Sequence, residues 1–284
     1  MANKVAGTAV GPMVIAAVEN QAPDGEALLR DDLAVRVLPP GVRWLVRQSR
    51  RGFVRRWLIA ASDKQAPGIW NSIACRKRYL DDTVAAAVRD GIDTIVVLGA
   101  GLDTRGARLA TPAGIPVFEV DLPVNIDAKR QRLPAADVTA VPIDFETEDL
   151  ATVLAAHGYR IGATTQFVWE GVTQYLTEEA VRATLAVSAK AGSGSRLAFT
   201  YVRRDFLDGV NDYGAQVLYE RFVVKDRIWR FGLNLGEVEA LLAEYGWRLV
   251  EQVGAQQFAT RYLTPIGRTG PVSDLECTVY AERE

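Results

Sequence analysis

A short apolar segment that ends in a glycine turn constrains the fold of this chain most strongly. The run from Thr94 to Leu98 is rich in β-branched residues, and it stops at Gly99 and Gly101. Such a run predicts a buried parallel strand, and the glycines let the backbone approach a bound nucleotide without a Cβ in the way. A helix can start near Asp103. The segment therefore predicts the first strand, turn and helix of a nucleoside-binding α/β unit.

The next predicted strand ends in a carboxylate, Asp121, at a distance from Gly101 that suits hydrogen bonds to a ribose diol. A dinucleotide fingerprint would carry a third glycine where this chain has Thr104. S-adenosylmethionine has no phosphate and needs no anion-binding helix N-terminus. The pattern therefore favours S-adenosylmethionine. An NAD(P)-dependent oxidoreductase and a non-catalytic nucleotide-binding regulator are the alternatives.

Apolar strands alternate with helical patterns from Gly91 onward. Strands are predicted over 94–98, 116–121, 138–143, 165–169, 196–202, 247–253 and 275–281, and helices over 103–110, 123–133, 146–157 and 177–191. This alternation is typical of a mostly parallel sheet with helices on both faces. Only a loop over 267–271 is expected between the last two strands, and so short a connection favours an antiparallel pair.

Two regions lie outside this alternation. Residues 1–75 favour helices and are interpreted as an N-terminal helical cap, which leaves 76–284 as the α/β domain. Residues 203–234 interrupt the pattern after the fifth strand, where insertions line the ligand crevice of open sheets. A helix is expected to open at Cys75 and to end at Gly91. Both outlying regions are therefore expected to cover the ligand site.

Composition and charge exclude several classes of protein. The chain has 284 residues and a formal net charge of −2, which gives no general attraction to nucleic acid or to anionic membranes. The segment from Arg43 to Arg56 holds six arginines and no acid. We interpret it as an amphipathic cap helix with a solvated basic face, rather than as a nucleic-acid or membrane helix. Cys75 and Cys277 lack metal-binding spacing and are typical of reduced cytoplasmic thiols.

Polar residues follow several strands at the edge where a ligand would bind. Asp144 and Phe145 end the third strand and suit an adenine ring, although a helix N-cap is an alternative role for Asp144. Glu170 follows the fourth strand, where the ammonium of a methyl donor would lie. Arg76 or Arg78 suits a ligand carboxylate, because guanidinium groups bind carboxylates well.

Few residues suggest a direct role in chemistry. His157 lies at a predicted helix end, which is its ordinary structural place, and no metal-binding, serine-hydrolase or phosphate-loop motif occurs. Tyr175 is the candidate catalytic side chain, with a place in the core wall as its alternative. Tyr201 and Arg203 are the candidate substrate-binding residues, for a flat apolar ring and for an anion.

Six segments carry a resemblance to a known family: Arg76–Asp82, Leu98–Arg105, Phe118–Pro123, Pro142–Asp144, Trp169–Leu176 and Trp229–Leu233. Together they resemble the leucine carboxyl methyltransferase superfamily, and in particular its bacterial members that O-methylate small molecules, such as the tetracenomycin-type polyketide O-methyltransferases. The resemblance implies a Rossmann-like, seven-stranded class I methyltransferase sheet whose last strand is antiparallel. It also implies that S-adenosylmethionine is the cofactor and that a polyketide-like carboxylate or phenol is the acceptor.

The resemblance also implies roles for single residues. Arg76 holds the methionyl carboxylate, with Arg78 as a neighbouring candidate, and Glu170 lies near the methionyl amino group. Asp121 takes the ribose hydroxyls, and Asp144 and Phe145 take the adenine. The rest of the cofactor surface comes from Gly99, Ala100, Gly101 and Leu122. No nucleic acid, membrane or metal is implied, and neither the identity of the acceptor molecule nor the oligomeric state carries over.

Overall fold

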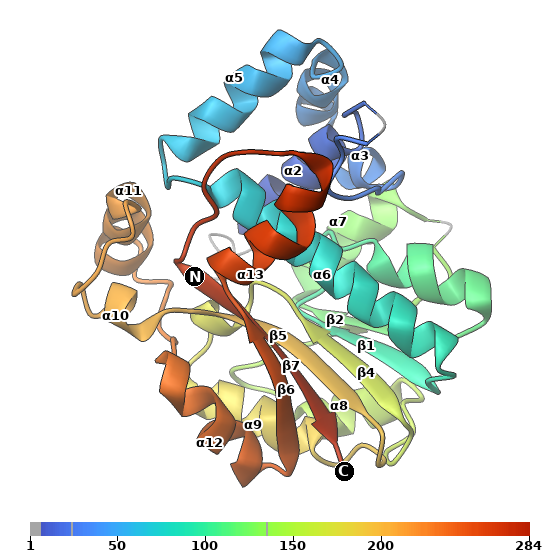
Figure 1. Cartoon of the computed structure of the whole chain (residues 1–284). Helices are drawn as coiled ribbons and strands as arrows, with labels where there is room; N and C mark the ends of the chain where they lie inside the picture. Colours follow the sequence, from blue (N-terminus) through green and yellow to red (C-terminus); the bar gives the residue numbers. More distant parts are fainter. Residues whose placement is uncertain (1–6, 24, 135) are drawn as a thin grey trace.

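The computed structural model describes residues 7–23, 25–134 and 136–284, and these form one seven-stranded sheet with helices on both faces (Figure 1). The strands are β1 (Thr94–Leu98), β2 (Val117–Asp121), β3 (Thr139–Pro142), β4 (Thr165–Trp169), β5 (Arg196–Val202), β6 (Trp247–Val253) and β7 (Glu276–Arg283). Their order is β3-β2-β1-β4-β5-β7-β6, and β7 alone runs antiparallel to its neighbours. The seven expected strands and the antiparallel last strand are confirmed.

The central strand β1 is buried on both faces because its alternate side chains enter two separate cores. Ile95 and Val97 pack in the core shared with α2 (Val10–Glu19) and α6 (Ile69–Arg89). Val96 and Leu98 pack in the core shared with α8 (Leu150–Ala156), α9 (Glu178–Ser188) and α12 (Val238–Glu244). A strand covered on both faces has a continuous apolar sequence, as β1 does.

The strand order reverses at β1, which lies between β2 and β4. The chain leaves β1 through the glycine turn toward β2, and it leaves β2 through α7 (Pro123–Arg132) toward β3. From β4 onward the strands are added on the other side of β1. A crevice forms at the carboxyl ends of the strands at such a reversal, and ligands of open α/β sheets bind there.

Two helices begin later than the sequence pattern predicts. α8 begins at Leu150 rather than Glu146, because Asp149 is its N-cap and accepts a hydrogen bond from the backbone N of Thr152 at 2.8 Å. The helix expected from Asp103 becomes a π-helical turn over Gly106–Ala110 and a short 3-10 turn over Thr111–Ala113. Thr177, the first residue of the predicted helix over 177–191, is the N-cap of α9.

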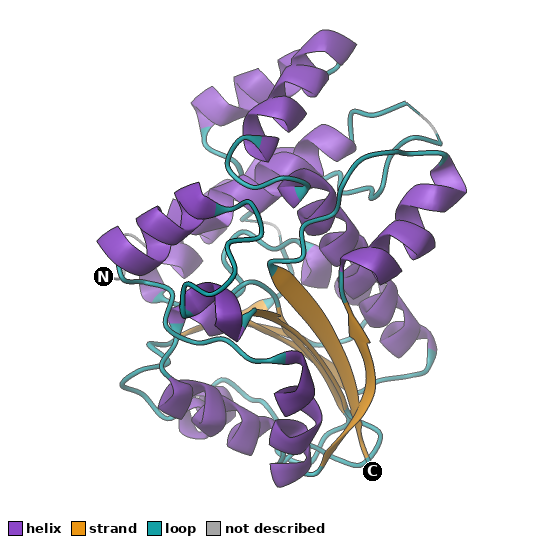
Figure 2. Cartoon of the chain, turned by 60° about the vertical axis from the view of Figure 1, so that its left-hand side comes forward, coloured by secondary structure: helices purple, strands orange, loops and turns teal. Residues whose placement is uncertain are grey.

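The N-terminal helices gather beyond the carboxyl ends of the parallel strands (Figures 1 and 2). They are a 3-10 turn (Gly7–Ala9), α2, α3 (Ala34–Val37), α4 (Pro40–Gln48), α5 (Gly52–Asp63) and α6. The helix expected to open at Cys75 begins instead at Ile69, after Gly68 in a left-handed conformation (φ 74°). α6 is thus one unbroken helix across residue 75. The first six residues of the expected cap lie outside the described residues.

The segment after β5 carries α10 (Arg204–Leu207), α11 (Gln216–Leu218) and a π-helical turn (Tyr219–Lys225), followed by a 3-10 turn (Leu235–Glu237). The connection from β6 to β7 differs from expectation. It holds α13 (Ala255–Phe258) and two further helical turns, Ala259–Leu263 and Thr264–Ile266, before the predicted loop. Phe258 packs its ring on Tyr79 of α6, with the centroids 6.1 Å apart. Within the described ranges, no helix combines the length and apolar composition needed to cross a bilayer.

Candidate active site

A cavity of about 780 Å³ lies at the carboxyl ends of the parallel strands, and residues of the N-terminal helices α2, α5 and α6 also line it. This volume is typical of cofactor and substrate sites. Ten of the residues proposed from the sequence line it: Arg76, Gly99, Ala100, Gly101, Asp121, Leu122, Asp144, Phe145, Glu170 and Tyr175. The fold therefore brings together, in one cavity, side chains from both halves of the sheet.

The glycine turn after β1 forms the floor of the cavity. Gly99 and Gly101 have positive φ angles of 66° and 46°, which side chains with a Cβ rarely adopt. A Cβ on Gly99 would lie 2.2 Å from Cγ2 of Val172. Position 99 therefore requires glycine for two reasons. Its backbone conformation is left-handed, and the segment after β4 approaches it too closely for a Cβ.

Gly99→Ala is expected to destabilise the fold by about 3 kcal/mol, because the strain of a left-handed alanine adds to the overlap with Val172. Gly267→Ala is a matched control, since Gly267 has nearly the same φ (64°) but no atom within 4 Å of the place that a Cβ would take. It should cost only about 1–2 kcal/mol. Urea unfolding measures both, and equal losses would show that Val172 moves aside without cost.

Asp121 ends β2 and is held by three donors. Its Oδ1 accepts hydrogen bonds from the backbone N of Leu122 and from Nδ2 of Asn125, each at 2.6 Å, and its Oδ2 accepts one from the backbone N of Gly101. The side chain is almost fully buried. Burial raises its pKa, while the bonds from Asn125 and Gly101 act in the opposite direction. Asn125, one helical turn further on in α7, was not identified from the sequence.

Arg76 of α6 lies between two carboxylates on the cavity wall. Its Nε is 3.0 Å from Oε1 of Glu170, and its Nη1 is 2.8 Å from Oε1 of Glu276. Arg78 points elsewhere, since it pairs with Asp82 at 2.9 Å and is half exposed. Of the two arginines proposed for a ligand carboxylate, the structure therefore brings only Arg76 to the cavity.

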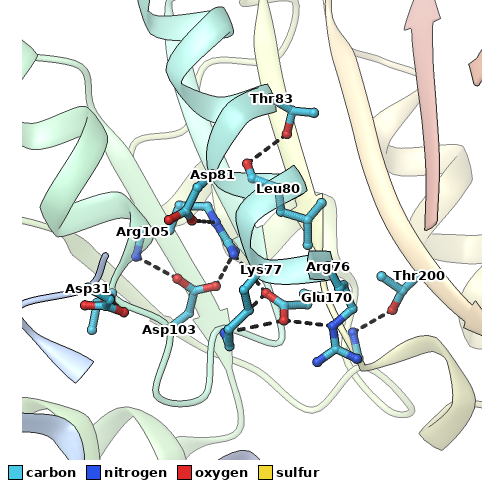
Figure 3. Close-up of polar contacts among 12 residues, drawn as sticks. Asp31, Arg76, Lys77, Leu80, Asp81, Thr83, Asp103, Arg105, Glu170 and Thr200 are labelled. Carbon is cyan, nitrogen blue, oxygen red and sulfur yellow. Dashed lines mark hydrogen bonds and ion pairs between the residues drawn. The ribbon is translucent and has the colours of Figure 1, made fainter. Parts of the chain in front are cut away.

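Glu170, which follows β4, is surrounded by cations (Figure 3). Besides Arg76, it contacts Nζ of Lys77 at 3.4 Å and Nη2 of Arg105 at 2.9 Å. Burial alone would raise the pKa of this carboxyl, but the charges of Lys77, Arg76 and Arg105 outweigh burial and hold the pKa well below its ordinary value. Glu170 is therefore ionised at neutral pH, and both of its oxygens are paired with cations of the cavity wall.

Arg105 connects this wall to a deeper group of charges. Its side chain is 1% exposed, and it contacts Asp103, Oδ1 of Asp81 at 2.8 Å and Glu170. Arg108 continues the network, with Nη2 2.7 Å from Oδ2 of Asp81. The network joins α6, the segment after β1 and the segment after β4, so it fixes three walls of the cavity relative to one another.

The residues proposed for adenine lie at the other end of the cavity. Asp144 and Phe145 both line it. The N-cap role considered for Asp144 is wrong, because Asp149 caps α8. Oδ1 of Asp144 instead accepts a hydrogen bond from the backbone N of Glu146 at 3.0 Å, within a turn. Its other carboxylate oxygen has no hydrogen-bond partner among the described residues.

The far part of the cavity is aromatic and apolar. Phe222 and Trp229 are stacked with their centroids 4.9 Å apart, and Tyr175 lies on the same wall. Burial raises the pKa of Tyr175, so its hydroxyl stays protonated at neutral pH. Leu58 of α5 and Leu218 of α11 complete this part from the two cap regions.

Two proposed substrate residues do not line the cavity. Tyr201 is fully buried in the core on the other face of β5, where its hydroxyl accepts a hydrogen bond from Nε2 of Gln252 at 2.9 Å. Arg203 lies over the ring of Tyr213, 5.3 Å from its centroid, and 3.6 Å from Asp205. In β5 it is Val202, between them, that lines the cavity. His157 follows the end of α8 and is exposed.

Glu276 is the main residue of this site that the sequence analysis missed. It is the first residue of β7, pairs with Arg76 and lines the cavity. Burial raises its pKa, against the lowering effect of Arg76. The signal was present, because the start of an antiparallel strand lies at the same sheet edge as the ends of the parallel strands.

The strand order, the cavity at the reversal point and the carboxylate that ends β2 define the fold of a class I methyltransferase. The sequence profile of one family, leucine carboxyl methyltransferase, matches residues 9–189. The chain belongs to this family. The family resemblance inferred from the sequence is thus confirmed, whereas the tetracenomycin-type branch stays a prediction.

Relatives and solved structures agree with this assignment. A Mycolicibacterium paratuberculosis protein named "Putative S-adenosyl-L-methionine-dependent methyltransferase" is 34% identical over 253 residues, 79% of each chain. A Streptomyces coelicolor protein of the same description is 32% identical over 211 residues, 71% of this chain and 70% of that protein. The structure of a "putative methyltransferase" from Thermobifida fusca matches with a TM-score of 0.58 at 17% identity, over 95% of this chain and 94% of that one. At such low identity this last match supports the fold alone.

Proposed function

We propose that this chain is an S-adenosylmethionine-dependent O-methyltransferase that methylates a carboxylate or phenol of a small, polyketide-like molecule. The observation that carries the proposal is the division of one cavity into two parts. One part holds the charged and polar groups that suit an adenosyl sulfonium amino acid, and the other is aromatic and apolar. The two parts meet near Arg76, Glu276 and Tyr175, which would place donor and acceptor side by side.

The residues present fit S-adenosylmethionine. Arg76 would hold its carboxylate, Glu170 its ammonium and Asp121 its ribose hydroxyls. Asp144 and Phe145 would hold the adenine, and the backbone of Gly99, Ala100, Gly101 and Leu122 would form the floor. Bound there, the cofactor supplies an electrophilic methyl group.

A nicotinamide dinucleotide fits this site less well. Its diphosphate would need free backbone N–H groups after the glycine turn. Here the backbone N–H of Arg105 already donates a hydrogen bond to Oδ1 of Asp103, at 2.6 Å. The carboxylate of Asp103 itself lines the cavity. A carboxylate at that place repels a diphosphate but not a sulfonium. The oxidoreductase alternative is therefore disfavoured.

The contribution of the chain to the reaction is alignment and exclusion of water. The cap helices and the aromatic wall would hold the acceptor oxygen in line with the methyl group. A carboxylate acceptor is already ionised near pH 7, whereas a phenol must lose a proton. Tyr175, which stays protonated, would donate a hydrogen bond to the acceptor oxygen and orient it.

Tyr175→Phe is expected to lower kcat by about tenfold, the value of one lost hydrogen bond, and to leave the affinity for S-adenosylhomocysteine unchanged. Tyr201→Phe is the matched control, because the hydroxyl of Tyr201 lies in the core and should not affect turnover. Steady-state kinetics and calorimetry measure the two effects. Equal kcat values for both variants would remove Tyr175 from the reaction.

The decisive test of the function combines binding and turnover. Isothermal titration should show micromolar binding of S-adenosylhomocysteine and none of NADH. A panel of aromatic acids and phenols, incubated with S-adenosylmethionine carrying a labelled methyl group, should yield labelled ester or ether. Micromolar binding of NADH without binding of S-adenosylhomocysteine would reverse the proposal. Binding of the latter without transfer to any acceptor would favour a cofactor-binding regulator.

A further inference from the structure

Helices α4 and α5 expose three large aromatic side chains. Trp44, Phe53 and Trp57 are 64%, 62% and 61% exposed. Phe53 and Trp57 are one helical turn apart on α5, and Trp44 lies on α4. Isolated exposed apolar residues are ordinary, but three large aromatics on consecutive helices are not. Figure 1 shows these helices at the outermost part of the cap, above the end of the sheet.

Unpaired arginines accompany these aromatics. Arg47, Arg51 and Arg56 are exposed, and no ion pair links them to any residue in the described part of the chain. They differ from Arg55, which pairs with Glu26 at 2.7 Å, and from Arg50, which donates to Oε1 of Gln21. We name Trp44, Arg47, Arg51, Phe53, Arg56 and Trp57 the basic aromatic surface.

The same helix α5 also forms part of the active-site cavity. Leu58, Ala61 and Ser62 line the cavity, and Ala61 lies one helical turn after Trp57, on the same side of the helix. No residue of α5 is buried. The basic aromatic surface therefore adjoins the wall of the cavity along α5. Whatever docks on this surface lies next to the aromatic, acceptor part of the cavity.

The chemistry of this surface indicates its occupant. Helices that carry arginines together with tryptophan and phenylalanine lie in the interface of anionic bilayers, where indole rings bury in the headgroup region and arginines bind lipid phosphates. A symmetric contact with a second copy would bring the arginines of one copy against those of the other. Duplex DNA would bind the arginines but leave the three aromatic rings in water.

We propose that the basic aromatic surface docks this protein on anionic membranes and that the acceptor reaches the cavity from the lipid phase. The second half of this inference rests on the proposed function, since it specifies the acceptor as a molecule that partitions into lipid. The first half concerns only the surface and stands without it. This inference revises the solvated role that the sequence alone suggested for the arginine-rich segment.

Vesicle sedimentation tests the docking. The full chain should bind vesicles of phosphatidylglycerol mixed with phosphatidylcholine, and should bind pure phosphatidylcholine far more weakly. The variant R47Q/R51Q/R56Q should lose about 100-fold in partitioning, at about fivefold per arginine near an anionic surface. The variant W44S/F53S/W57S should also lose binding, and its residual binding, which the arginines carry, should remain sensitive to salt. R130Q/R160Q/R248Q removes the same charge from exposed sites elsewhere and should bind as the wild type does.

Three results would overturn the proposal. One is the absence of vesicle binding, and a second is equal loss in the R130Q/R160Q/R248Q control. The third is salt-dependent DNA binding, or dimer formation, that R47Q/R51Q/R56Q abolishes while vesicle binding persists. Because none of the three arginines lines the cavity, this variant should bind S-adenosylhomocysteine and turn over a water-soluble acceptor normally. Failure of docking is thereby distinguished from failure of the methyltransferase assignment.

Discussion

Asp121→Ala is expected to weaken the binding of S-adenosylhomocysteine by more than tenfold. An ionised carboxylate offers about four acceptor positions, and Asp121 uses three of them on Gly101, Leu122 and Asn125. The remaining position is on Oδ2, the oxygen next to the glycine turn and the cavity. A hydrogen bond from a ribose hydroxyl to a buried charged group contributes about 1.5–3 kcal/mol, which is the basis of the expected loss.

Isothermal titration measures this loss, and Asn125→Ala provides the comparison. It removes one donor to Asp121 but keeps the carboxylate, so binding should weaken only a few-fold. Thermal melting of both variants checks that the fold is retained, because alanine at position 121 also leaves the backbone N–H groups of Gly101 and Leu122 without their partner. A folded Asp121→Ala variant that binds like the wild type would remove the ribose assignment.

Most of the sheet could be predicted because its signals are local. A β-branched run that is buried on both faces, such as Thr94–Leu98, has a continuous apolar sequence that few other structures produce. Helix starts were less predictable because a cap depends on one side chain. Asp149 rather than Glu146 starts α8, and the left-handed Gly68 sets the start of α6 well before Cys75. The helical segment between β6 and β7 was missed because it contacts α6, a distant partner.

The residues of the candidate site were likewise predictable only in part. Residues that follow a parallel strand, such as Asp121 and Glu170, could be placed from the sequence, since topology brings those strand ends together. Tyr201 could not, because a shift of one residue along β5 turns a side chain from the cavity to the core. Glu276 enters the site from a strand that runs the other way. The predicted antiparallel strand could have placed it at this sheet edge, but its pairing with Arg76, 200 positions away in the sequence, leaves no local pattern.

Arg105→Met is expected to destabilise the protein by about 3–5 kcal/mol, the largest effect on stability that we expect. The substitution keeps most of the side-chain volume but leaves Asp81, Asp103 and Glu170 without their shared cation in a buried position. Losing one member of a buried charge network costs far more than losing a surface pair, because the remaining charges stay desolvated. For a chain of this size, the melting temperature should fall by about 10 °C. Calorimetry and urea unfolding measure both quantities.

The matched control is Arg182→Met, since Arg182 also contacts two carboxylates, at 2.9 Å on Glu178 and 2.6 Å on Glu244, but is 40% exposed. It should cost far less, because exposed ion pairs are screened by solvent.

The effect of Arg105→Met on stability should also depend on pH. A carboxyl whose pKa is lower in the folded state, such as Glu170, adds stability above its unfolded pKa of about 4.3 and loses it as the pH falls toward the folded value. Arg105→Met raises that folded pKa, so the stability gap to the wild type should be widest near pH 7 and narrow below about pH 4. A gap that does not change with pH would mean that the cost comes from packing rather than from charge.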